Sequence, residues 1–213
     1  MERAAPLWLA ALLGGLAGAA TFDLSAAERQ NALSAGQALA AKHQGYPVAD
    51  YLIYDVHDAL QLHPDQGSVE AVQVATPWER ARWAGYLLSV QGKPVSEQAA
   101  QVIDDLKSGQ VDFIVFAHSS GEGKDYQNFL KTFSAAHLNL GSRDLTPVNT
   151  AYSGAAVDNY RDLNGNVTFL WSGNVTYRFD LSQMPSTPQS GTLSFTDASG
   201  KKWNLKVDLS QYK

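Results

Sequence analysis

Val-Thr-Tyr-Arg-Phe-Asp-Leu, residues 175–181, alternates apolar and polar side chains at every position. Successive side chains of a strand point to opposite faces, so this period of two predicts an antiparallel strand with one buried face. Residues 203–209 (Trp-Asn-Leu-Lys-Val-Asp-Leu) repeat the pattern, and shorter versions cover 136–140, 167–171 and 193–195. Several such strands together predict a β-sandwich or a partial barrel.

Three short polar stretches lie among these strands and predict the turns that join them. They are Asn164-Gly165, Ser172-Gly173-Asn174 and Asp197-Ala198-Ser199-Gly200. Glycine, asparagine and aspartate adopt the backbone conformations of tight turns at little steric cost. The C-terminal half therefore predicts a series of hairpins.

A different pattern occurs upstream, at residues 111–118. Its centre is apolar at every position, since Phe113 and Val115 alternate with Ile114 and Phe116. A strand that is apolar on both faces is typical of the middle of a covered sheet. We expect this strand to be central and to be a candidate for joining the C-terminal sheet.

The first half of the chain has the pattern of helices with a strand or two. Asp23 or Ser25 predicts the start of a helix that continues to Ala41. Residues 47–60 begin with a proline suited to a first turn and have apolar positions at helical spacing. They predict a second helix, with a strand over 51–57 as the alternative.

A strand and two more helices are expected next. The valine-rich residues 69–75 predict the strand. Residues 76–79 (Thr-Pro-Trp-Glu) suit a helix start, because the threonine can cap the helix and the glutamate can bind the cap backbone. That helix is expected to reach about Val90, and Ser96 predicts the start of another that ends at Gly109.

These elements predict an α+β fold. N-terminal helices with one or two strands are followed by an antiparallel β-sandwich-like C-terminal unit. The expected divisions are a signal peptide at 1–20, a helix-rich α/β region at 21–109 and a β-sandwich-like region at 110–213. The last two regions are alternatively one continuous domain.

The N-terminus has the three parts of a secretory leader. Arg3 gives a weak positive start, Leu7 to Leu16 form an apolar stretch, and Ala17-Gly18-Ala19 offers small residues for cleavage. The alternative is a membrane anchor, but the apolar run is only about 14 residues, against the roughly 20 that a spanning helix needs. We expect cleavage, a secreted or periplasmic protein, and no membrane span in the mature chain.

Composition excludes several classes of function. The 213 residues carry a net charge of −5 and no run of Lys or Arg, so nucleic-acid binding is not expected. The absence of cysteine excludes disulfides, thiolate catalysis and iron–sulfur clusters. No glycine-rich phosphate loop occurs either, and the sequence predicts no cofactor.

Residues 117–121, Ala-His-Ser-Ser-Gly, have the spacing of a nucleophile elbow with alanine in place of the first glycine. The elbow would expose Ser119 on a strained turn between a strand and a helix. A hydrolase of this kind also needs an acid and then a histidine further along the chain. His137 follows too closely for the intervening elements, so a strand ending in a polar loop is the preferred interpretation.

The acid- and histidine-rich segment 55–65 is the densest set of potential metal ligands. Its members are Asp55, His57, Asp58, His63 and Asp65. A metal needs such groups to converge on one point, yet on a helix the two histidines lie on different sides. A solvated surface is therefore preferred, and no metal is predicted.

Two further patterns are weaker. Residues 162–166 (Asp-Leu-Asn-Gly-Asn) carry calcium-type oxygens but lack the length of an EF-hand, so a hairpin turn is the simpler interpretation. Five Trp, nine Tyr and eight Phe could include an exposed row that binds carbohydrate or a protein, although core packing is the default.

These observations favour an exported, non-catalytic binding or accessory protein of the cell envelope or extracellular space. Its partner would be a protein or glycan of the envelope, and the sequence does not indicate an oligomeric state. The alternatives are an exported hydrolase, using the 118–122 loop or the 55–65 segment, and a structural subunit of an envelope assembly. The candidate ligand-binding residues are Asp55, His57, His118, Ser119 and Glu122.

Overall fold

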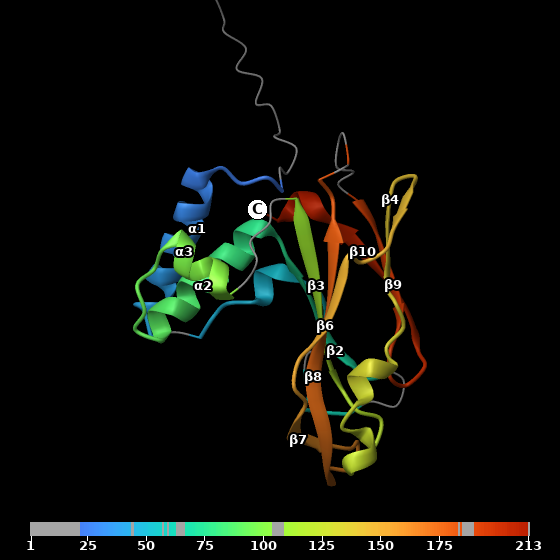
Figure 1. The fold of residues 1–213 in the computed structure, drawn as a ribbon. Helices are drawn as coiled ribbons and strands as arrows, with labels where there is room; N and C mark the ends of the chain where they lie inside the picture. Colours follow the sequence, from blue (N-terminus) through green and yellow to red (C-terminus); the bar gives the residue numbers. More distant parts are fainter. Residues whose placement is uncertain are drawn as a thin grey trace, which may run out of the picture.

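The chain folds as a few helices beside two antiparallel sheets (Figure 1). The computed structural model describes residues 22–212 except 44, 57, 59, 63–66, 104–108, 183 and 185–189. The predicted signal peptide, residues 1–20, lies outside the described residues. Three α-helices and ten strands within the described part, with strands dominating the C-terminal part, confirm the predicted α+β class. No helix in that part has the length and hydropathy needed to cross a bilayer.

The helices start where the sequence predicts. They are α1 (Ala26–Ala40), α2 (Pro77–Val90) and α3 (Glu97–Ile103). Ser25 caps α1 in a capping box with Glu28, in which each side chain accepts a hydrogen bond from the other's backbone N–H. The Thr76 hydroxyl accepts from the N–H of Glu79, and Ser96 caps α3 in the same way. The predicted end of this last helix falls partly outside the described residues.

Two glycines allow α1 and α2 to touch through their backbones. A Cβ atom on Gly36 would lie 1.9 Å from the carbonyl oxygen of Arg82, and one on Gly85 would lie 2.1 Å from that of Leu33. Only a residue without a side chain permits so close an approach. The helices also have a small buried core of their own, made of Leu33, Ala84, Leu88 and Ala100.

Residues 47–60 contain a strand where the sequence favours a helix. A 3₁₀ turn at Ala49–Tyr51 leads into β1 (Leu52–Asp55), which pairs antiparallel with β2 (Val69–Ala75). The predicted second helix is wrong, and the alternative strand is closer to the structure. Pairing with β2 satisfies the backbone groups of this segment, and Ile53 packs against the main core, so tertiary contacts outweigh the helical spacing.

Sheet A, the first sheet, crosses the middle of the chain. Besides β1 and β2 it contains β3 (Gln110–His118), β6 (Asn149–Tyr152), β7 (Ala156–Arg161) and β8 (Val167–Asp180). Its order is β1-β2-β3-β8-β6, and β7 also pairs with β8. The strand β3 therefore has a neighbour on each side, as its apolar centre predicts. The predicted boundary at residue 110 runs between two strands of this one sheet.

Sheet B, the second sheet, comes entirely from the C-terminal half. Its order is β10-β9-β4-β5. The strands are β4 (His137–Leu140), β5 (Arg143–Leu145), β9 (Ser190–Thr196) and β10 (Lys202–Asp208). Further 3₁₀ turns occur at Lys124–Tyr126, Phe129–Thr132 and Leu209–Gln211.

The predicted turn at residues 172–174 is absent, because β8 runs unbroken through it. Gly173 lies opposite Ala117 of β3, and the pairing continues without a shift in register on both sides. On its other edge β8 pairs with β6 along one half and with β7 along the other. Because β8 has a hydrogen-bonded neighbour along both edges, a continuous strand pairs more of its backbone than a turn at residues 172–174 would.

The other two predicted turns are confirmed. The Asp162 carboxylate accepts hydrogen bonds from the backbone N–H groups of Asn164 and Asn166, which closes the hairpin between β7 and β8. The Asp197 carboxylate does the same for Ser199 and Lys201 between β9 and β10. In both turns an aspartate replaces missing backbone partners, as turn chemistry predicts.

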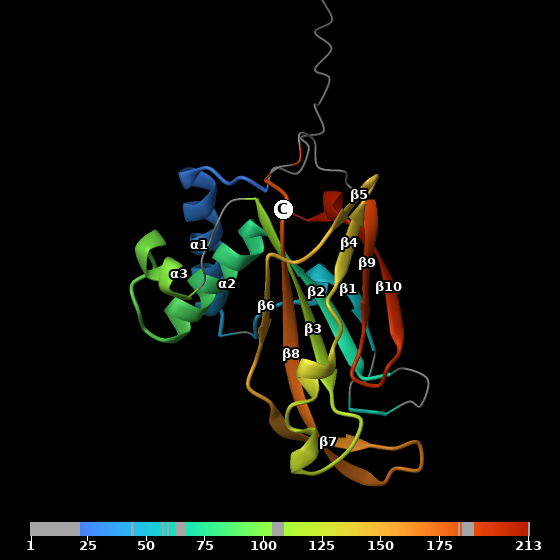
Figure 2. The same cartoon turned by 45° about the vertical axis from the view of Figure 1, so that its right-hand side comes forward.

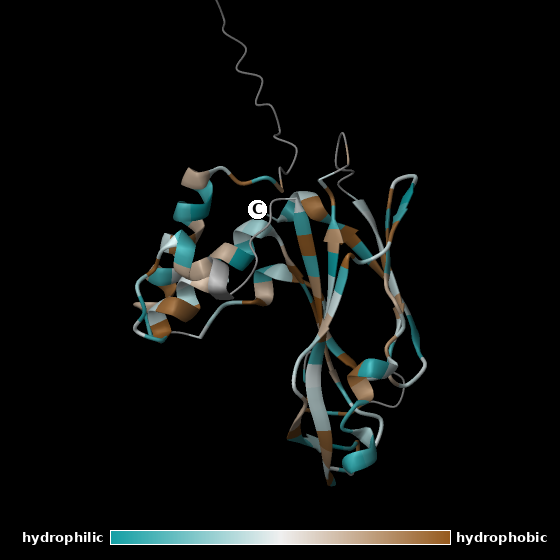
Figure 3. Cartoon of the chain, in the orientation of Figure 1, coloured by the Kyte–Doolittle hydropathy of each residue, from teal (hydrophilic) through white to brown (hydrophobic). Residues whose placement is uncertain are grey.

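Sheet A lies between the helices and sheet B, as Figures 1 and 2 agree. Its inner face packs on sheet B in one large core, which includes Phe113, Val115, Val175, Tyr177 and Phe179. Its outer face, turned toward the helices, carries the alternate residues of β3 and β8: Asp112, Ile114, Phe116, Asn174, Thr176 and Arg178. Apolar and polar segments alternate along these strands in Figure 3.

Candidate functional site

A cleft of about 620 Å³ separates α2 from the outer face of sheet A. Its floor comes from β2, β3, β6 and β8, and its wall comes from α2 and the segment before β1. The larger apolar side chains of the floor are Ile114 and Phe116, both of which are only half-buried. A volume of this size is within the range of small-molecule sites.

An ion pair occupies the floor of this cleft. The Arg178 guanidinium binds both carboxylate oxygens of Asp112, with Nε–Oδ1 and Nη2–Oδ2 distances of 2.7 Å. The Arg80 Nε atom of α2 lies 3.6 Å from Asp112 Oδ2, and both of these residues are buried. Bidentate pairing fixes the plane of the guanidinium group and orients it as a rigid part of the site.

A second charged group forms part of the wall. Glu79 accepts a hydrogen bond of 2.8 Å from the Tyr46 hydroxyl, and its Oε2 lies 2.9 Å from Arg82 Nε. The Arg82 guanidinium lies 4.9 Å from the ring centres of both Tyr46 and Tyr51. Burial raises the pKa of Glu79 to about 7, although the hydrogen bond from Tyr46 and the charge of Arg82 act to lower it.

Aromatic rings complete the wall. Trp83 is 41% exposed and stacks on Tyr86 with ring centres 5.7 Å apart, while Tyr46 meets it edge-on at 4.8 Å. Half-exposed aromatic rings in a concave site offer apolar contact area together with an orientation preference.

Four polar side chains of the floor have unused hydrogen-bonding capacity. They are Gln73, Asn149, Asn174 and Thr176. Gln73 is only 7% exposed, yet its amide makes no hydrogen bond to any other described residue. The Gln73 amide is not among the buried side-chain atoms that lack a partner, so it keeps contact with solvent through the cleft and is available for hydrogen bonding there.

Three of the residues singled out from the sequence, His118, Ser119 and Glu122, line a second hollow of about 650 Å³. The Ser119 hydroxyl donates to the Gly121 carbonyl at 2.7 Å and accepts from the Trp171 N–H at 3.1 Å. This serine is fully buried, and the chain continues as a polar loop, which is the interpretation the sequence preferred.

The other two predicted residues that line this hollow, His118 and Glu122, also have partners within the protein. His118 Nδ1 lies 2.9 Å from the Ser119 carbonyl oxygen. The Glu122 carboxylate accepts hydrogen bonds from the Thr168 hydroxyl and from the Phe169 N–H, and these bonds lower the pKa of Glu122. The polar groups of the loop thus form hydrogen bonds that connect the end of β3 to β8.

The acid- and histidine-rich segment does not extend this hollow. Asp55 is the exposed last residue of β1 and does not line the hollow. His57, His63 and Asp65 lie outside the described residues. Among the residues that the structure does describe, no three His, Asp or Glu side chains are grouped as a metal site would require.

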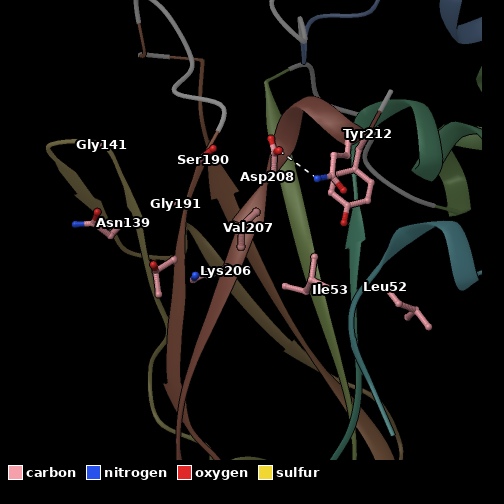
Figure 4. A pocket seen from close by; sticks show the side chains of 12 residues that line it. Leu52, Ile53, Asn139, Gly141, Ser190, Gly191, Lys206, Val207, Asp208 and Tyr212 are labelled. Carbon is pink, nitrogen blue, oxygen red and sulfur yellow. Dashed lines mark hydrogen bonds between the residues drawn. The ribbon is translucent and has the colours of Figure 1, made fainter. Parts of the chain in front are cut away.

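A third hollow, of about 710 Å³, lies at the end of the sandwich between β1 and β10 (Figure 4). Asn139 on one side and Leu52 on the other are widely separated around it in this view. The dashed line marks a 3.1 Å hydrogen bond from the Gln211 amide to Asp208.

The sequence did not indicate the main residues that line the cleft. Thr176 and Arg178 are the polar partners of an alternating strand, which usually means exposure to solvent. One signal was available: Asp112 interrupts the apolar sequence of β3 between Val111 and Phe113. A charged residue in a central strand is expected to have a buried partner.

Comparisons with known proteins find a weak similarity between this chain and a solved structure. No family model matches the chain, and no curated protein matches it. A crystal structure from Burkholderia pseudomallei, described as a novel protein of unknown function, aligns with 89% of this chain and 92% of its own. The sequence identity is 8% and the TM-score is 0.37. Function must therefore be argued from the geometry of this chain.

Proposed function

We propose that the protein is an exported, non-catalytic binding protein whose ligand occupies the cleft between α2 and sheet A. The observation that carries this proposal is the floor of the cleft, where the side chains of Gln73, Asn149, Asn174 and Thr176 have no hydrogen-bond partner among the described residues. These polar groups face the cleft, where water can hydrogen-bond to them. A ligand with matching donors and acceptors takes the place of that water.

The arrangement of the charges favours binding over catalysis. Asp112 is held by Arg178, and Glu79 is held by Tyr46 and Arg82. Groups fixed in pairs like these support the shape of a site and orient its neighbours. The polar groups with unused capacity are amides and a hydroxyl, which recognise ligands by hydrogen bonds.

Export is supported by the leader-like sequence of residues 1–20. The test is to express the full chain in a bacterium and to determine the N-terminus of the protein recovered from the periplasm. Cleavage after Ala19 or Ala20 is expected. Full-length protein that starts at Met1 and stays in the cytoplasm would contradict export without bearing on the cleft.

Binding itself is tested by thermal unfolding against a panel of sugars, nucleotides, peptides and divalent metals. A ligand of the folded state raises the melting temperature by mass action. The rise is expected in the native chain and in Asn139→Leu, a control on sheet B, but not in Gln73→Leu. A panel member that stabilises all three proteins equally would place the site elsewhere.

A further inference from the structure

The unused hydrogen-bonding groups of the cleft share one chemical property. The side chains of Gln73, Asn149 and Asn174 each offer both N–H donors and a carbonyl acceptor, and the Thr176 hydroxyl also does both. None of the four side chains is hydrogen-bonded to another described residue. They therefore match ligand groups that both donate and accept hydrogen bonds, as hydroxyl groups and amides do.

The charged groups of the cleft are already engaged. The Asp112 carboxylate is bound through both oxygens by Arg178, and Arg80 lies against it as well. The Glu79 carboxylate is bound by Tyr46 and Arg82. Breaking a buried pair of this kind leaves an uncompensated charge, so a ligand that leaves these pairs intact binds at lower cost than one that replaces a partner.

The cleft has apolar surfaces on its wall and on its floor. Trp83 presents a partly exposed ring on the wall, and Ile114 and Phe116 lie between the polar side chains of the floor. A sugar ring has apolar C–H faces and a rim of hydroxyl groups. This combination fits an aromatic wall above a floor of amides.

A peptide fits the same floor less well. Extended peptides bind sheets mainly through backbone hydrogen bonds to a free strand edge. Most of the floor presents side chains, because β2, β3 and β8 each have a paired strand on both sides. Among the described floor strands only β6, which pairs with β8 alone, has a free edge.

We infer that the ligand of this cleft is a short, neutral saccharide, an inference that rests on the proposed binding function. Its hydroxyl groups hydrogen-bond to Gln73 and Thr176, and a C–H face of one sugar ring packs on Trp83. Loss of one such hydrogen bond is expected to weaken binding about tenfold.

The test uses the full chain recovered after expression and three sets of probes in parallel. The first set is an array of neutral mono-, di- and oligosaccharides, the second is phosphorylated and carboxylated saccharides, and the third is a library of short peptides. Affinity for each positive probe is measured by calorimetry with the native chain and with Thr176→Val. The matched control is Thr192→Val, the same nearly isosteric change on β9 of sheet B.

The expected result is a neutral saccharide that binds the native chain and Thr192→Val equally and binds Thr176→Val about tenfold more weakly. Circular dichroism and the melting temperature of each variant without ligand show that it is folded. Binding of only charged saccharides or only peptides, with the same sensitivity to Thr176→Val, would overturn the saccharide assignment and preserve the binding function. Absence of binding in all three sets would overturn both.

Discussion

The two faces of sheet A use the same strands for opposite purposes. On the inner face of β3 and β8, Phe113 and Phe179 are fully buried against sheet B and meet edge-on at 5.7 Å. On the outer face of the same strands, Ile114, Phe116 and Thr176 remain partly exposed in the cleft. The comparison shows that one alternating sequence can supply stability on one face and recognition on the other.

The largest expected effect comes from the inner face. Phe113→Ala should destabilise the fold by about 3–5 kcal/mol, because it removes a fully buried ring and leaves a cavity. Phe116→Ala, three residues along on the outer face of the same strand, should cost clearly less because its ring is only half-buried. Urea unfolding at constant pH measures both values. Equal losses from the two variants would show that the faces do not differ in this way.

The next effect concerns the wall that faces the outer sheet. Because burial raises the pKa of Glu79 from 4.5 to about 7, the folded state holds a proton that the unfolded state loses above pH 4.5. The contribution of Glu79 to the free energy of unfolding is full below pH 4.5 and is lost as the pH rises through the folded-state pKa of about 7. A shift of this size corresponds to about 3 kcal/mol at 1.36 kcal/mol per pH unit.

The matched variant for this pH dependence is Glu79→Gln, which keeps an acceptor for Tyr46 but cannot titrate. Unfolding free energies at pH 4.5, 6 and 7.5 should fall for the native chain by about 3 kcal/mol more than for the variant. Other groups face the same carboxylate, namely Tyr46, Tyr51 and Arg82, and they are common to both proteins. Parallel pH curves would mean that Glu79 is ionised throughout.

A smaller effect is expected from the helix layer. In Gly85→Ala the new Cβ would meet the Leu33 carbonyl oxygen, so α1 and α2 must move apart, at a cost of about 1–3 kcal/mol. Gly154→Ala is the control, because a Cβ there meets nothing within 4 Å. Differential scanning calorimetry of the two variants should show a lower melting temperature only for the first.

The smallest effect on stability is expected from the cleft floor itself. Gln73→Leu removes an amide that has no partner among the described residues, so the fold should keep its stability or gain up to about 1 kcal/mol. The same variant should lose ligand binding. A large loss of stability would instead identify Gln73 as a structural residue and remove the main support for the binding site.

The sequence predicted the inner face far better than the outer one. Alternation at 175–181 and 203–209 correctly placed Tyr177 and Trp203 in the core, because burial of one face is a local, repeating signal. The helix predicted at 47–60 was wrong, since the pairing of β1 with β2 depends on residues far along the chain. The cleft was missed for the same reason: Thr176 becomes part of a site only when α2 lies above it.

The unbroken course of β8 has a consequence for how a ligand would be received. This strand is paired with β3 over nine residue pairs, from Gln110 and Asp180 to His118 and Ser172, and its opposite edge is paired with β6 and β7. Amides in such a strand open only when most of the domain opens, and they should exchange with solvent last. The floor of the cleft is consequently preorganised, and the entropy cost of binding falls mainly on the ligand and on the side chains of the wall.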